Sequence, residues 1–177
     1  MPASPVPRGE SAAARLLASL ASLPGKEAIV FGKRSLSFGD ISLLAGRYAR
    51  SLAALGVRRG DRVAVFAETT PDLVVALVGH HLLGAVHVPV NTHYREEEAG
   101  HILRDSGATA ILLDPASPCA QVLRRCGELP SLRHVISLGA EGTGIPFASL
   151  VPFATLAAFS SLVSPGSRDP GLSLIHI

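Results

Sequence analysis

Residues 61–90 read DRVAVFAETTPDLVVALVGHHLLGAVHVPV, and this stretch decides the fold. RVAVF (62–66) is apolar on both of its alternating faces, which is typical of a strand that is covered by helices on each side. TPD (70–72) supplies an N-cap, a proline for the first helical turn and an acid at the positive helix end, and Gly84 supplies the stop. VHVPVN (86–91) is the next strand. The stretch therefore predicts a strand–helix–strand unit, the connection that joins parallel strands.

The same unit recurs along the chain. The predicted strands begin near Arg62, Val86, Ala108 and Arg133, at intervals of 24, 22 and 25 residues, and every interval holds a helical pattern. In the last interval this pattern is ASPCAQVLRRC (116–126). The spacing predicts an α/β fold with an open, mainly parallel sheet and helices on both faces.

A β-hairpin and two helices are predicted before this sheet. EAIVF (27–31) and RSLSF (34–38) flank a short connection that contains glycine, as in a hairpin. Apolar residues at steps of three and four predict a helix from Gly39 to Leu55. SAAARLLASLASL (11–23) has helical spacing as well, so we interpret it as a surface helix; a targeting peptide is the alternative, because the segment is rich in serine and contains arginine.

The composition is that of one folded domain. The chain has 177 residues, of which 47% are hydrophobic and 17% charged, with a mean hydropathy of +0.37, and such a chain is not disordered. Lys and Arg total 16 against 14 Asp and Glu, a net charge of +2, and aromatic residues make up only 5%. This small charge excess and low aromatic content argue against a nucleic-acid partner.

The sequence predicts a cytoplasmic protein without a membrane span. The longest apolar candidate, residues 73–90, is interrupted by glycines and histidines. Cys119 and Cys126 lie seven residues apart on a predicted helix, about 10.5 Å along its axis, which is too far for a disulfide. We interpret them as reduced, partly buried thiols, with a metal pair as the alternative.

Candidate ligand-binding residues follow the predicted strands, because parallel α/β sheets bind ligands beyond the carboxyl ends of their strands. They are Ala67 to Thr70 after the first strand, Asn91 to His93 after the second and Asp114 after the third. Glu68 and Asp114 would lie at neighbouring strand ends as paired carboxylates; helix capping or solvent exposure is the other use of each.

The signatures of several enzyme classes are absent from the sequence. Neither GxGxxG nor GxxxxGK[ST] occurs, which argues against a Rossmann dehydrogenase and a P-loop NTPase, and GxSxG and HExxH are missing too. GAEGTG (139–144) could cradle a phosphate, but we interpret it as a flexible loop. His80 and His81 point roughly 100° apart on a helix, so we interpret the histidines as packing or surface residues rather than metal ligands.

Three segments carry a family resemblance. RSLSFGDI (34–41) is similar to the motif LTYxEL, with Phe38 in place of tyrosine, and GVRRGDRVAVF (56–66) is similar to G(V/L)xxGDRV. HLLGAVHVPVNTHYREEEAGHILRDSGA (81–108) is similar to xxGAVxVPxNxxxxxxExxxxLxDSxA, and is the most specific of the three. Together they resemble the N-terminal part of adenylate-forming enzymes, the superfamily of acyl-CoA synthetases, luciferases and peptide-synthetase adenylation domains.

The resemblance implies a fold, a domain organisation and a function. The chain would be a partial N-terminal subdomain of the acyl-CoA synthetase-like fold. Residues 1–10 would be a flexible N-terminus, 11–163 an incomplete synthetase N-terminal region, and 164–177 a linker and a tail that need not be native. The parent enzyme would be an ATP-dependent, AMP-forming acid–CoA ligase of fatty acid metabolism, with a carboxylic acid, ATP, Mg and coenzyme A as its partners.

The groups that perform this chemistry in the family lie further along than this chain extends. They are a phosphate-binding loop ending in lysine, a glutamate that helps to hold magnesium, an aspartate for the ribose and a lysine of the C-terminal domain. SRDPG (167–171) resembles the approach to that loop, and LSLIHI then ends the chain. We therefore interpret the chain as a truncated reading frame that is inactive alone and binds no cofactor, and we assign no residue as catalytic, cofactor-binding or metal-binding.

The positions of the third segment that match its motif are interpreted as scaffold. Gly84 and Pro89 would shape the turn from helix to strand, and Asn91 and Arg95 would hold the following loop. Asn91 after VPV favours acyl-CoA ligases over peptide-synthetase modules. A peptide-synthetase adenylation fragment and a non-catalytic α/β binding module are the alternatives, and a sheet cut from a larger core would self-associate through exposed apolar surface.

Overall fold

The strand–helix–strand unit forms as predicted and continues into a larger sheet. The computed structural model describes residues 12–114, 118–138 and 150–152. Its helices and strands, in chain order, are α1 (Ala12–Ser22), β1 (Glu27–Phe31), β2 (Arg34–Ser37), α2 (Phe38–Ala54), β3 (Arg62–Phe66), α3 (Pro71–Leu83), β4 (Val86–Pro89), α4 (Glu96–Ser106), β5 (Ala110–Leu113), α5 (Pro118–Arg125), β6 (His134–Ser137) and β7 (Leu150–Pro152).

The central sheet is parallel throughout, with the strand order β4-β3-β5-β6-β7. The predicted open parallel sheet is confirmed, but the sequence indicated four strands and missed β7. Leu150–Pro152 is only three residues long, so alternation of apolar and polar residues cannot identify it. It is recognised only through its pairing with β6.

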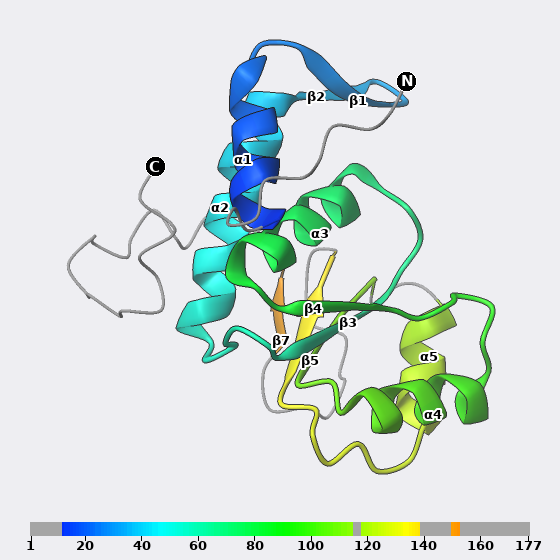
Figure 1. The fold of residues 1–177 in the computed structure, drawn as a ribbon. Helices are drawn as coiled ribbons and strands as arrows, with labels where there is room; N and C mark the ends of the chain where they lie inside the picture. The colour runs from blue at the N-terminus through cyan, green and yellow to red at the C-terminus, as the bar shows by residue number, and fades with distance from the viewer. Residues whose placement is uncertain (1–11, 115–117, 139–149, 153–177) are drawn as a thin grey trace, which may run out of the picture.

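Helices cover both faces of this sheet (Figure 1). Val63 and Val65 of β3 pack into a core with α1, α2 and α3. Ala64 and Phe66, on the opposite face of the same strand, pack into a second core with α4 and α5. All four side chains are at most 4% exposed. The continuous apolar run of β3 predicted a strand that is buried on both faces, and the structure confirms this prediction.

Helix α3 departs from the prediction in one respect. Its apolar residues run nearly all round, so the sequence predicts complete burial, and Val75, Ala76 and His80 are indeed buried. Leu77, however, is 37% exposed and His81 is exposed as well. The helix packs against α1, α2 and β4, and Leu77 and His81 lie on the part of its surface that these elements leave exposed.

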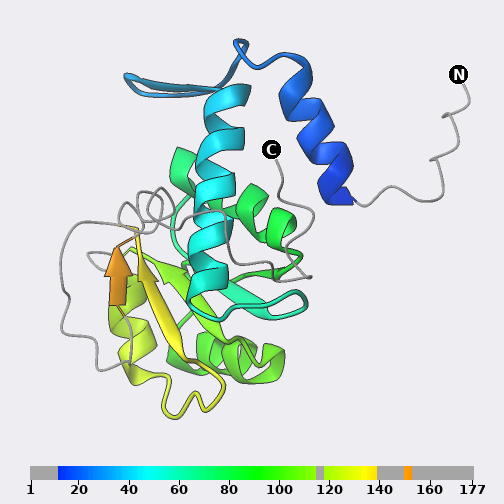
Figure 2. The same cartoon turned by 90° about the vertical axis from the view of Figure 1, so that its left-hand side faces the viewer.

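The hairpin and the first two helices form the other end of the molecule. Strands β1 and β2 pair antiparallel in a sheet of their own, as predicted. Ser37 then caps α2: its hydroxyl accepts the Asp40 amide at 3.1 Å, and the Asp40 carboxylate accepts the Ser37 amide at 2.9 Å. Figure 2 shows α1 beside the upper part of α2, at the far end from α4 and α5. The predicted helix within residues 11–23 is confirmed, and whether it also serves in targeting stays a prediction.

Some predictions fall outside the described residues. They are the flexible N-terminus, the loop at 139–144, a short helix suggested by FATLAAFSSLV (153–163), and the tail. Within the described part of the chain, none of the helices has the length and hydropathy to cross a bilayer. Cys119 and Cys126 are both buried and are not bonded to each other in this structure.

Candidate functional site

The sheet has one topological switch point, between β3 and β5. The chain leaves β3 through α3 to reach β4 on one side, and then returns through α4 to place β5 on the other side of β3. Open α/β sheets bind ligands in the crevice outside the carboxyl ends of the strands at such a point. The candidate site therefore consists of residues 67–70 after β3 and Asp114 after β5.

The structure brings the two predicted carboxylates to neighbouring strand ends. Phe66 pairs with Leu113 at the end of the β3–β5 ladder; Asp114 follows Leu113 directly, and Glu68 lies two residues beyond Phe66. Glu68 is exposed and Asp114 is half-buried. Thr70 has a different use, since its hydroxyl accepts the Leu73 amide at 3.3 Å and caps α3. The switch point thus presents two carboxylates beside the positive end of a helix.

The loop after β4 is held by its own side chains. The Asn91 side-chain oxygen accepts the His93 amide at 3.0 Å, and the Arg95 amide donates to the Glu98 carboxylate at 3.1 Å. β4 is the edge strand, so β3 separates this loop from β5. These contacts support the interpretation of Asn91 and Arg95 as residues that hold the loop.

The second and third sequence motifs meet at the amino ends of β3 and β5, opposite to the switch point. The Arg62 guanidinium donates from Nε to the Ser106 carbonyl and from Nη2 to the Gly107 carbonyl, both at 2.8 Å. These carbonyls end α4, where backbone acceptors lack helical partners. The preceding Asp61 accepts the Arg58 amide at 2.8 Å and so closes the turn into β3. The contact between Arg62 and α4 has no signal in the sequence, because its partners lie 44 and 45 residues apart.

The first motif is tied to the entrance of α3. Arg34 of β2 forms a two-pronged ion pair with Asp72, with nitrogen–oxygen distances of 2.8 and 2.9 Å. This hydrogen-bonded carboxylate raises the pKa of Arg34. The sequence predicts Asp72 as an acid at the positive end of α3, and the structure adds the ion pair that joins the hairpin to this helix end.

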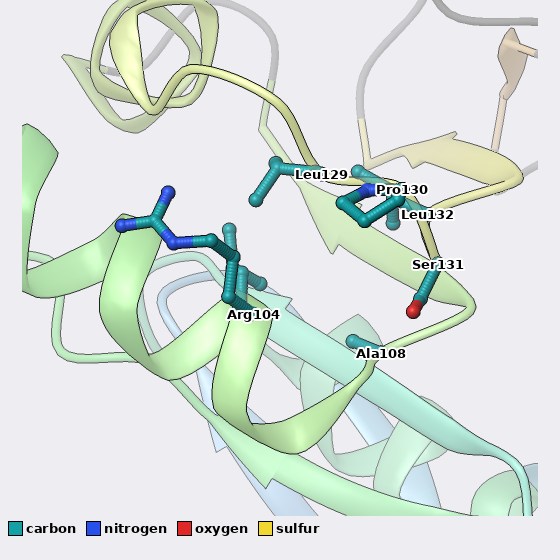
Figure 3. A pocket seen from close by; sticks show the side chains of 7 residues that line it. Arg104, Ala108, Leu129, Pro130, Ser131 and Leu132 are labelled. Carbon is teal, nitrogen blue, oxygen red and sulfur yellow. The ribbon is translucent and has the colours of Figure 1, made fainter.

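Two hollows formed by described residues lie away from the switch point. One, of about 170 Å³, is lined by Leu103, Arg104, Ala108 and residues 129–132, at the amino ends of β5 and β6 (Figure 3). The Arg104 side chain at its rim donates to the Cys126 carbonyl at 2.8 Å. The other, of about 360 Å³, lies between α1 and α2 and is mainly apolar. Neither contains a residue that follows a strand of the sheet at its carboxyl end.

The histidines and acids of the described part do not assemble into a metal site. No group of three His, Cys, Asp or Glu side chains close enough to hold an ion occurs in residues 12–114, 118–138 and 150–152. His80 is fully buried against Tyr48 and His87, whereas His81 is exposed and contacts the Leu77 carbonyl. The interpretation of His80 and His81 as a packing residue and a surface residue is therefore supported.

Comparison with known proteins identifies the family. The sequence pattern of the AMP-binding enzymes matches residues 16–156. Over 126 residues the chain is 32% identical to tyrocidine synthase 3 of Brevibacillus parabrevis, which is 70% of this chain and 2% of that protein. Over 96 residues it is 33% identical to the long-chain-fatty-acid–CoA ligase FadD13 of Mycobacterium tuberculosis, which is 54% of this chain and 19% of that protein.

Solved structures agree with the sequence relatives. The anthranilate CoA ligase AuaEII, solved in complex with anthranoyl-AMP, superimposes with a TM-score of 0.77 and 27% identity. The match covers 89% of this chain and 30% of that one, so the chain spans less than a third of the length of these relatives. Because the family pattern covers well over half of its residues, the chain belongs to the AMP-binding enzymes, the adenylate-forming ligases.

Proposed function

We propose that the chain is the N-terminal portion of an ATP-dependent, AMP-forming acid–CoA ligase. The observation that carries this proposal is the structural match to AuaEII, which extends over 89% of the chain. Further solved structures that match it with at least 25% identity include a benzoate CoA ligase and the N-terminal domain of FACL13 from Mycobacterium tuberculosis.

The proposed reaction has two steps. A carboxylate oxygen attacks the α-phosphate of ATP, which forms an acyl-adenylate and releases pyrophosphate. The thiol of coenzyme A then attacks the acyl carbon, which forms the thioester and releases AMP. Both steps need positive charge at the phosphates and at the developing oxyanion.

The described residues contribute support rather than this charge. Arg62 closes α4, Arg34 holds Asp72, and Arg104 binds a backbone carbonyl, so three well-placed cations are engaged in structural contacts. Magnesium would need several oxygen ligands from the protein or the nucleotide. The described residues contain no cluster of three acidic or other metal-binding side chains, so they do not fit a magnesium ion and we assign it no step.

We further propose that these 177 residues do not catalyse adenylation alone. The test is acid-dependent exchange of labelled pyrophosphate into ATP, measured with a panel of aliphatic and aromatic carboxylic acids. The 177-residue chain should give no exchange above a boiled control. Robust, acid-dependent exchange would refute the claim of inactivity while supporting the family function.

The claim that this is a portion of a longer enzyme has a separate test. Sequencing the coding DNA beyond Ile177 should reveal, in frame or after a frameshift, a segment rich in Ser, Thr and Gly that ends in Lys, of the type YTSGTTG. A stop codon without such a segment downstream would contradict the proposal. The two tests are independent, because the first asks about activity and the second about the length of the gene.

A peptide-synthetase adenylation domain is the second candidate. The observation that favours it is the match to tyrocidine synthase 3, which covers more of this chain than the match to FadD13 does. The two candidates differ in the acceptor of the acyl group. The protein encoded by the complete gene should form a thioester with free coenzyme A if it is a ligase, and with the phosphopantetheine of a carrier domain if it is a synthetase module.

A non-catalytic α/β binding module is the third candidate. Val30 and Phe31 at the hairpin and Leu43 on α2 are more than half exposed, and such apolar surface favours self-association. If the chain is instead a fragment of a larger enzyme, it should associate in a concentration-dependent way in analytical ultracentrifugation. A stable monomer with a cooperative thermal transition would favour the independent module instead.

A further inference from the structure

Three side chains from three elements form a buried chain of hydrogen bonds. Tyr48 of α2 lies 3.1 Å from Nε2 of His80 on α3, measured from its hydroxyl oxygen. Nδ1 of His80 lies 2.9 Å from Nδ1 of His87 on β4. Tyr48 and His80 are fully buried and His87 is half-buried. We call these residues the Tyr48–His80–His87 chain.

The fold makes room for this chain. A Cβ on Gly79 would lie 2.6 Å from Cδ1 of Tyr48, so only glycine at this position lets the ring approach α3. The ring centroids of Tyr48 and His80 are 5.5 Å apart, and those of His80 and His87 are 5.1 Å apart. The chain therefore connects α2, α3 and the edge strand β4 at a closely packed position.

The contact between the two histidines limits how many protons it can hold. A nitrogen–nitrogen hydrogen bond needs one proton between the two Nδ1 atoms, so one ring must donate and the other must accept. With both rings neutral, they must be opposite tautomers. If one ring is protonated, the other can still accept through its bare Nδ1. If both are protonated, two N–H groups face each other and the bond is lost.

The other groups that act on the pair offer no compensation for added charge. Tyr48 faces His80 from α2, and its hydroxyl can donate or accept as required. His81, the neighbour on α3, and His87 on β4 both act on His80 as like charges when protonated. In the described residues, the ion pairs with carboxylates are formed by Arg34, Arg125 and Arg133, and none of them involves these histidines.

We propose that the Tyr48–His80–His87 chain is an acid-sensitive latch that holds α3 and the edge strand β4 together while the histidine pair carries at most one added proton. A second proton breaks the Nδ1–Nδ1 bond and frees the α3–β4 corner. The latch belongs to the scaffold and does not depend on the function proposed above.

The direction of the pH dependence follows from burial. Desolvation first, and then the neighbouring histidines, lower the pKa of His80 to about 3, and burial also lowers the pKa of His87. Both rings take up protons more readily in the unfolded chain, where the pKa is about 6.5. Stability is therefore complete above the unfolded pKa and is lost as the pH falls towards the folded values.

The first test needs only the wild-type protein. Two-dimensional ¹⁵N–¹H spectra of the histidine rings at pH 7.5 should show opposite tautomers for His80 and His87, with the proton on Nδ1 in one ring and on Nε2 in the other. Identical tautomers would overturn the proposal. So would a folded-state titration in which both rings become fully protonated while the amide protection of β4 is unchanged.

The second test measures stability between pH 7.5 and 5.5. A histidine with an unfolded pKa of 6.5 that stays neutral in the fold lowers the folding equilibrium constant about tenfold over this range. Urea unfolding of the wild type should show this fall in the folding equilibrium constant between pH 7.5 and 5.5. In His80→Gln, the ratio of the constants at the two pH values should be about tenfold smaller than in the wild type. His101→Gln, an exposed histidine of α4, is the matched control and should keep the wild-type dependence. An unchanged dependence in His80→Gln would overturn the proposal.

Hydrogen exchange localises the effect and covers the case in which His80→Gln does not fold. The Val86 amide of β4 donates to the Asp61 carbonyl, and the Thr109 amide next to β5 donates to the Arg62 carbonyl. After correction for intrinsic rates, acid should lower the protection factor of Val86 more than that of Thr109. An equal decrease at both amides would show global unfolding only, and would overturn the latch.

Discussion

Replacement of Arg62 by methionine should destabilise the protein by about 2–3 kcal/mol. Methionine keeps most of the apolar stem but removes both guanidinium bonds to the Ser106 and Gly107 carbonyls, each 2.8 Å long. Hydrogen bonds from a charged group contribute about 1.5–3 kcal/mol each. Both carbonyls belong to half-buried residues, so water replaces part of the lost contact and the total, about 2–3 kcal/mol, falls below the sum of two such bonds.

Urea unfolding followed by circular dichroism measures this free energy, provided that the slope with denaturant is unchanged. Arg62→Lys should recover at most half of the loss, because lysine cannot place two donors in the geometry of a fork. Arg133→Met is the matched control. Its side chain is 57% exposed and its Nη2 lies 3.8 Å from Asp61, so loss of this contact should cost less than about 1 kcal/mol. If Arg62→Met costs no more than Arg133→Met, the bond between the two motifs does not stabilise the fold.

Three further substitutions test other contacts by the same unfolding experiment. Gly79→Ala should cost about 1–2 kcal/mol, because overpacking against Tyr48 outweighs the better helix propensity of alanine; a gain in stability would contradict the 2.6 Å approach. Ser37→Ala should cost about 1 kcal/mol through loss of the α2 cap, whereas Ser37→Gly should lose only part of this. Arg34→Met should cost about 0.5 kcal/mol at low salt, because the pair with Asp72 is half-exposed, and almost nothing in 1 M salt. A loss that is independent of salt would show that Arg34 acts through packing instead.

The elements with their own start and stop signals were predictable. Helix α3 begins after Thr70 and ends before Gly84, which adopts a φ of +74°, a conformation that glycine tolerates without strain. The continuous apolar run of β3 likewise indicated a strand with two buried faces. These signals are local, so the sequence within a few residues is enough to read them.

The elements that depend on partners were not predictable. β7 has three residues and is defined by its pairing with β6. The exposure of Leu77 on α3 depends on which elements pack beside that helix, and its apolar sequence contains no sign of the open face. The contacts of Arg62 and Arg34 join positions far apart in the chain. The sequence does not indicate which distant group accepts a hydrogen bond from a charged side chain.

The candidate site divides in the same way. The sequence identified the strand ends as the place to look, and it identified Glu68 and Asp114 as the acids there. Their adjacency follows from the strand order, because the chain places β4 on one side of β3 and returns through α4 to place β5 on the other side. The switch point is therefore a property of topology, and no single loop encodes it.

The sequence alone determined the α/β class, the order of the main elements and the family, because caps, apolar periodicity and motif spacing are written within short segments. The tertiary structure decided which strands are neighbours, which arginines hold helix ends, and that Tyr48, His80 and His87 meet in one buried chain. The physical reason is that burial and hydrogen-bond partners arise only when distant segments pack. A histidine at position 80 is an ordinary helical residue in the sequence, and it becomes a group with a strongly lowered pKa only when α2 and β4 exclude water from it.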